Sequence, residues 1–289
     1  MLSCLIMKNL LFRYALAFSL LFPMPMLCTT VVVIATQSGI VITTDSKTGV
    51  IENGIFTRSL EHHPKFVILN NRFVIAAAGT VDIRSGRNHF EFLPWATGLQ
   101  FRIANDATVE QLAGRVKNES ASMFLRVGID DMVKNGTYKN STDVAPCEMF
   151  TQFIVAGLQA GTWHLYKVQY DIDWRNKRLL GPTEEDLESE WNPFGPERPL
   201  VFRFGVVEAI QDANNHESYA YKKIKELSPK AIADFESGMY HLPLQETIAL
   251  SRALVQVEKD TNPTLVGGDI KSAEILPDGT AKEVPDPQP

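Results

Sequence analysis

The segment that most constrains the fold is a run of β-branched and apolar residues at 29–36, Thr-Thr-Val-Val-Val-Ile-Ala-Thr. β-branched side chains favour extended backbone. A Gln-Ser-Gly turn at 37–39 leads into a second such run at 40–47, Ile-Val-Ile-Thr-Thr-Asp-Ser-Lys. Two runs of this kind around a short turn predict a β-hairpin. Any fold of this chain must therefore build a sheet around residues 29–47.

A second hairpin is predicted from Lys65 to Gly79, because two apolar runs flank an Asn70-Asn71 turn. The residues between the two hairpins are predicted to form a polar loop, and together the hairpins predict a β-meander that continues to about residue 81. Thr108 with Gln111 three residues later is a capping box, which predicts the start of a helix that stops near 135–136.

The rest of the chain alternates between blocks of strands and blocks of helices. Strands are predicted at 150–158, 161–170, 200–207 and 266–275, and helices at 216–226, 229–239 and 243–259. Segregated blocks of this kind predict an α+β fold in which helices cover stacked antiparallel sheets. We expect a single domain at 29–282, with a polar acidic insertion at 171–199 and a disordered tail at 283–289.

Composition and charge restrict the partners. The chain has 289 residues, of which 45% are hydrophobic and 21% are charged, and its net charge is −6. The only charged residues among the first 28 are Lys8 and Arg13, so residues 29–289 have a net charge of −8. Such a surface argues against nucleic acid or an anionic membrane as the main partner. The cysteines are Cys4, Cys28 and Cys147, which offer no disulfide framework and no metal-binding spacing. No metal and no cofactor are therefore expected.

The N-terminus has the pattern of an export signal. Two basic residues precede an apolar run at 14–22 that is too short to span a bilayer comfortably, and Pro23 follows it. The sequence predicts a signal peptide at 1–28, or at 7–28 if Met7 is the true start, and a periplasmic or secreted protein. An uncleaved anchor and a lipoprotein site at Cys28 remain as alternatives.

Removal of that segment would leave Thr29 with a free α-amine. The amine has an ordinary pKa of about 7.7–8, so near neutral pH it can accept the proton of the threonine hydroxyl. An N-terminal threonine therefore contains both a nucleophile and a base. Without cleavage, Thr29 is an ordinary strand residue.

Three further residues of the two hairpins have suitable chemistry. Asp45 ends the partner strand of the first hairpin, where its carboxylate can return to the start of the first strand. Lys65 begins the third strand, and its cation would stabilise a developing alkoxide. Gly79 ends the fourth strand, where its unhindered N–H would suit an oxyanion hole.

This set of residues resembles the N-terminal-nucleophile (Ntn) hydrolases, in particular the proteasome β-subunit and bacterial proteasome-like threonine peptidase family. The resemblance lies in Thr29-Thr30, in Thr44-Asp45-Ser46-Lys47, in Lys65 and in Ala78-Gly79. It extends loosely to Gly267-Gly268-Asp269-Ile270. It implies a four-layer αββα sandwich of two antiparallel sheets flanked by helices.

The resemblance also implies an exported threonine hydrolase that cleaves peptide or other amide bonds and has a ring-forming homo-oligomer as its assembly. Its catalytic residues would be Thr29, Asp45 and Lys65, with Gly79 as the oxyanion hole. Asp260 and Thr264 match supporting residues near the terminal amine. Two alternatives stay open: a catalytically inactive binding or assembly subunit of the same fold, and cleavage one residue earlier that makes Cys28 the nucleophile.

Overall fold

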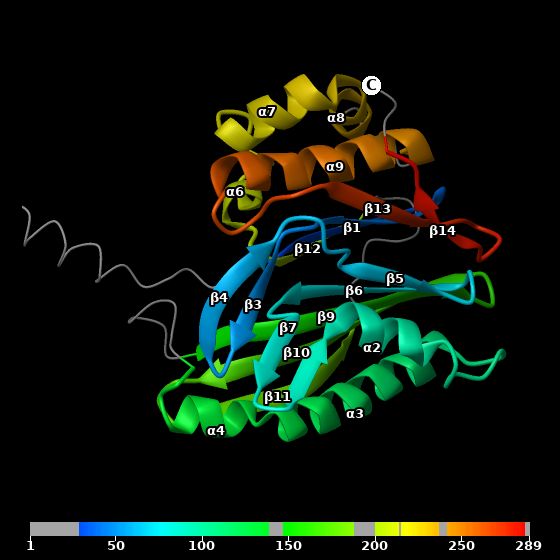
Figure 1. Ribbon diagram of the computed structural model, residues 1–289. Helices are drawn as coiled ribbons and strands as arrows, with labels where there is room; N and C mark the ends of the chain where they lie inside the picture. The colour runs from blue at the N-terminus through cyan, green and yellow to red at the C-terminus, as the bar shows by residue number, and fades with distance from the viewer. Residues whose placement is uncertain (1–28, 139–146, 188–199, 214, 237–241, 287–289) are drawn as a thin grey trace, which may run out of the picture.

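The computed structural model describes residues 29–138, 147–187, 200–213, 215–236 and 242–286 (Figure 1). The predicted signal peptide at 1–28 lies outside these residues. Within the described residues, no helix is both long and apolar enough to cross a membrane.

The first sheet contains the N-terminal hairpin and is antiparallel throughout. Its strand order is β12-β1-β2-β13-β14. The strands are β1 (Thr30–Thr36), β2 (Gly39–Asp45), β12 (Leu200–Gly205), β13 (Ile270–Ile275) and β14 (Ala281–Val284). β14 includes residues 283 and 284, so the expected disordered tail does not begin at 283.

The second sheet contains the second predicted hairpin, with strand order β11-β10-β9-β6-β5. Its strands are β5 (Phe66–Leu69), β6 (Phe73–Gly79), β9 (Cys147–Gln159), β10 (Thr162–Asp173) and β11 (Arg178–Asp186). The predicted continuous meander was wrong, because the two hairpins belong to different sheets. The expected insertion at 171–199 is also not wholly a loop, since it contains β11, while residues 188–199 lie outside the described part of the chain.

A third sheet corrects the predicted fold class. Its strand order is β4-β3-β7-β8, and the strands are β3 (Thr48–Glu52), β4 (Ile55–Leu60), β7 (Asp82–Ser85) and β8 (Asn88–Glu91). β3 and β7 pair in parallel. The expectation of a four-layer αββα sandwich with two antiparallel sheets was therefore wrong: the fold is α+β with three sheets, and one of them is mixed.

The helices lie on the outer faces of the two larger sheets (Figure 1). On the first sheet, α9 (Leu244–Thr261) packs directly against β1, β2 and β13. Three further helices contact α9: α6 (Glu208–Gln211), α7 (Tyr219–Leu227) and α8 (Pro229–Glu236). A second group packs against the second sheet: α2 (Phe92–Leu99), α3 (Val109–Val127) and α4 (Ile129–Lys134). The capping box at Thr108 and Gln111 is confirmed. The predicted single helix is broken at Gly128 into α3 and α4, and α4 ends at Lys134, at the predicted stop.

Alternating side chains connect the layers. In β1, Val31 and Val33 enter the core between the two larger sheets, whereas Val32 and Ile34 face the helices α7 and α9. In β6, Val74, Ala76 and Ala78 enter the inter-sheet core, and Phe73, Ile75 and Ala77 enter the core under α3. Side chains that alternate between two apolar cores are what a strand buried on both faces requires.

Candidate functional site

Thr29 and Thr30 are held at the start of β1 by the edge strand β12. The backbone N–H of Val206 donates to the carbonyl of Thr29 at 3.1 Å, and the Thr30 hydroxyl donates to the carbonyl of Val206 at 2.6 Å. Thr29 is only 1% exposed. The position of the predicted nucleophile is therefore set by contacts with a strand distant in the sequence.

Asp45 and Lys65 form a fully buried ion pair, as the two hairpins bring their ends together. The Lys65 Nζ lies 3.3 Å from each carboxylate oxygen of Asp45, and both side chains have no exposed surface. Lys65 also donates to the carbonyl of Lys47. The pair links two sheets, because Asp45 ends β2 and Lys65 directly precedes β5.

The Asp45 carboxylate is also joined to the start of β1. Its Oδ1 accepts the backbone N–H of Thr30 at 3.0 Å. Its Oδ2 accepts the N–H groups of Lys47 at 3.2 Å and Gly267 at 3.1 Å. Burial raises the pKa of Asp45, while the Lys65 ammonium and the backbone hydrogen bonds from Gly267 and Thr30 act in the opposite direction. The Asp45 carboxylate thus holds both the Lys65 ammonium and the backbone of Thr30, the residue next to Thr29.

Gly79 lies at the same end of the stacked sheets. It has a φ of +85°, and a Cβ there would lie 2.5 Å from the carbonyl oxygen of Phe150. Gly205 lies between Thr29 and Ala78, the residue before Gly79. A Cβ on Gly205 would lie 1.7 Å from the Thr29 carbonyl oxygen and 3.1 Å from the Cβ of Ala78. Four of the predicted residues, Thr29, Asp45, Lys65 and Gly79, are therefore gathered in one region.

Asp260 and Thr264 do not join this group. Both are exposed, and the Asp260 carboxylate accepts from Gln256 within the same helix. The Asp45 carboxylate binds Thr30, Lys47, Lys65 and Gly267, and neither Asp260 nor Thr264 is among these partners. The supporting role of Asp260 and Thr264 therefore stays a prediction.

Several residues of the site escaped sequence reasoning. Gly267 both donates to Asp45 and accepts the N–H groups of Ser46 and Lys47 through its carbonyl. A polar chain also reaches Gly205, whose N–H donates to Gln152 at 3.2 Å, and Gln152 donates to Gln169 at 2.8 Å. The Gly267-Gly268 pair was a usable signal for close backbone contact, whereas Gln152 and Gln169 depend on strand register and leave no short motif.

Outside this region, His62 is exposed and pairs with Asp269. Within the described residues, no group of three or more histidine, cysteine, aspartate or glutamate side chains is arranged to hold a metal ion. No protein-family model matches the sequence, and no curated protein is significantly similar to it.

Proposed function

We propose that the chain is an exported N-terminal threonine hydrolase that cleaves peptide or other amide bonds once residues 1–28 have been removed. The observation that carries the proposal is the buried Lys65–Asp45 pair, which is hydrogen-bonded to the amide next to Thr29. Its substrate would be a peptide or amide and its compartment the periplasm or the extracellular space.

The position of the ion pair favours a catalytic role over a purely stabilising one. Taking two charges out of water costs several kcal/mol per ion, so a buried pair is weak support for stability alone. Here the Asp45 carboxylate of the buried pair accepts the backbone N–H of Thr30 at the start of β1, next to the proposed nucleophile. Fixed charges of this kind act strongly on charge that develops in a reaction.

In the proposed mechanism, the Thr29 Oγ attacks the substrate carbonyl carbon and its proton passes to the Thr29 α-amine. Lys65 stabilises the alkoxide, and Asp45 orients Lys65. The Gly79 N–H donates to the oxyanion of the tetrahedral intermediate. Collapse of that intermediate transfers the proton to the leaving amine and leaves an ester on Thr29, which water then hydrolyses.

A second candidate is an inactive binding or assembly subunit. The exposed positions of Asp260 and Thr264 favour it, because side chains in solvent are poorly placed to support an amine on the buried Thr29. In that case Thr29 would keep the preceding segment, or its free amine would have no catalytic effect. A ring-forming homo-oligomer is compatible with both candidates, and native mass spectrometry would establish the assembly.

The deciding experiment compares two forms of the mature chain, one that begins at Thr29 and one that carries a single extra alanine before it. N-terminal sequencing and intact mass confirm each start, and fluorogenic peptide amides measure hydrolysis. We expect the extra residue to lower the rate at least about 100-fold, because it removes the free amine as base.

Two substitutions complete this experiment. Thr29→Ala should abolish turnover, whereas Thr36→Ala, a buried threonine at the far end of the same strand, should retain it. Equal activity with and without the extra residue would refute the proposed base. Inactivity of every form, including the chain from the native export host, would favour the inactive subunit; a native chain that begins at a free Cys28 would favour the cysteine alternative.

A further inference from the structure

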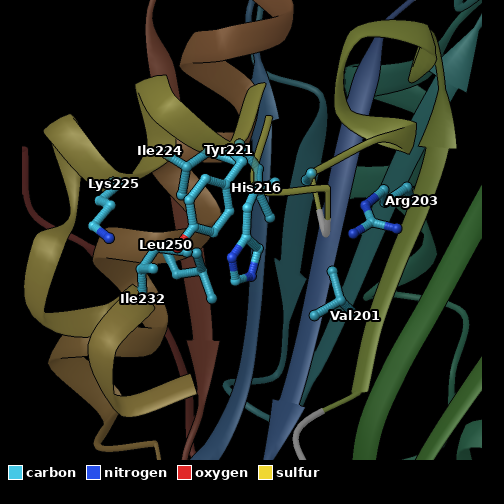
Figure 2. A pocket seen from close by; sticks show the side chains of 10 residues that line it. Val201, Arg203, His216, Tyr221, Ile224, Lys225, Ile232 and Leu250 are labelled. Carbon is cyan, nitrogen blue, oxygen red and sulfur yellow. The ribbon is translucent and has the colours of Figure 1, made fainter. Parts of the chain in front are cut away.

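A cavity of about 570 Å³ lies between the first sheet and its helices, away from Thr29 (Figure 2). Most of its wall is apolar. The apolar lining residues are Val201, Ala213, Ile224, Ile232, Leu250 and Leu254. Its volume falls within the range of about 300–1,000 Å³ typical of small-molecule sites.

Arg203 is an unexpected residue in this wall. It stands opposite Val32 in the β1–β12 register, on the face of the sheet that packs against the helices. Its Nε is buried and has no hydrogen-bond partner among the described residues. Burial lowers the pKa of the guanidinium. A buried cationic donor without an acceptor is costly, so an anionic acceptor would stabilise it.

The other polar lining residues add positive charge and aromatic surface. Lys225 is exposed at the cavity and lies 5.5 Å from the centre of the Tyr221 ring. The His216 ring stacks on Tyr221 at 4.4 Å, between the helices and the strand that carries Val201 and Arg203 (Figure 2). None of the residues that line the cavity is an aspartate or a glutamate. Two cationic side chains, Arg203 and Lys225, therefore line a mostly apolar cavity that has no carboxylate in its lining.

We propose that this cavity binds a small monocarboxylate with an apolar tail. A guanidinium presents its donors in a planar fork that matches a carboxylate, and the aliphatic side chains would remove the tail from water. Lys225 adds a second charge. The cavity is separate from the Thr29 site, because its lining includes none of Thr29, Asp45, Lys65 and Gly79.

Isothermal titration of the whole protein with decanoate tests this proposal, with decan-1-ol as the uncharged probe of equal chain length. We expect saturable binding of one decanoate per chain, and binding of decan-1-ol at least about tenfold weaker, because charged hydrogen bonds contribute more than the 1.4 kcal/mol of one decade. Butyrate, which has the same head group and a short tail, should also bind more weakly.

Arg203→Gln should weaken decanoate binding at least about tenfold. Arg87→Gln changes the net charge equally at an exposed turn between β7 and β8, and it should leave binding unchanged. Because Arg203→Gln could disturb folding, Lys225→Gln at the exposed rim provides a second variant, with Lys222→Gln on the same helix as its control. Absence of saturable decanoate binding, equal affinity for decan-1-ol, or equal effects of Arg203→Gln and Arg87→Gln would overturn the proposal. None of these readouts depends on hydrolysis.

Discussion

Lys65 and Asp45 have no exposed surface, so water cannot solvate either charge if its partner is removed. Replacing Lys65 with Met leaves the Asp45 carboxylate buried with only backbone donors. We expect Lys65→Met to lower the free energy of unfolding by about 3–5 kcal/mol. Urea unfolding measures the change.

The double variant Asp45→Asn, Lys65→Met distinguishes the effect of the ion pair on stability from its effect on hydrolysis. It removes both charges, so it should recover part of the lost stability, because replacing both partners of a buried pair costs less than removing one. Peptide hydrolysis should be abolished both in Lys65→Met and in the double variant. Activity in the folded double variant would contradict the role proposed for Lys65.

Gly205 is the residue whose replacement should disturb Thr29 most directly. It has a φ of +80°, and a Cβ would lie 1.7 Å from the Thr29 carbonyl oxygen, which is far inside contact distance. We expect Gly205→Ala to lower the free energy of unfolding by more than about 2 kcal/mol and to reduce hydrolysis. Gly86→Ala is the matched control, since it also has positive φ but no atom lies within 4 Å of its Cβ position. Equal losses in both variants would show that the contact with Thr29 is unimportant.

At the scale of elements, local signals predicted the hairpins β1–β2 and β5–β6 and the start of α3. The β3–β4 hairpin was predicted as a polar loop, although Asn53-Gly54 turns it with positive φ at both residues. The flanking strand β4 is mostly exposed and lacks an apolar run. Hydrophobic periodicity therefore gave no sign of the third sheet. The pairing of β1 with β12 joins residues far apart in sequence, which no local pattern can reveal.

The helix α9 carries a buried carboxyl whose ionisation should affect stability. Glu258 is fully buried and accepts the N–H of Ala209, near the start of α6, at 3.1 Å. Burial raises its pKa, and Glu208 raises it further, while Asn262 opposes the shift. The folded state thus binds this proton more tightly than the unfolded state. The resulting stability is present below the ordinary pKa of 4.5 and is lost as the pH rises through the raised value.

Glu258→Gln keeps an oxygen that can accept from Ala209 but removes the ionisable group. We expect it to increase the free energy of unfolding more at pH 8 than at pH 5, as measured by urea unfolding at both values. Glu110→Gln, at an exposed position in α3, serves as the control for a change of one surface charge. The same effect of Glu258→Gln at both pH values would contradict the raised pKa.

At the scale of the whole molecule, the candidate site depends on how two sheets are stacked. Asp45 ends β2 and Thr29 directly precedes β1 in the first sheet, whereas Lys65 directly precedes β5 and Gly79 ends β6 in the second. The spacing of the two sheets therefore sets the distance between their groups. Small side chains, including Ala76 and Ala78, face the first sheet from β6. The sequence indicated the residue types of the site, but this spacing arises only from the packed core.

Enlarging a side chain between the sheets should therefore reduce activity beyond its effect on stability. Ala76→Leu should lower the free energy of unfolding by roughly 1–3 kcal/mol through overpacking. Ala113→Leu, at an equally buried position on the inner face of α3, should cost a similar amount without changing the distance between the two larger sheets. Hydrolysis measured well below both unfolding midpoints should fall in Ala76→Leu and not in Ala113→Leu, because only the first substitution pushes Asp45 and Lys65 apart. Equal rates in the two variants would mean that the site tolerates a change in sheet spacing, and the buried pair would then not position Lys65 for catalysis.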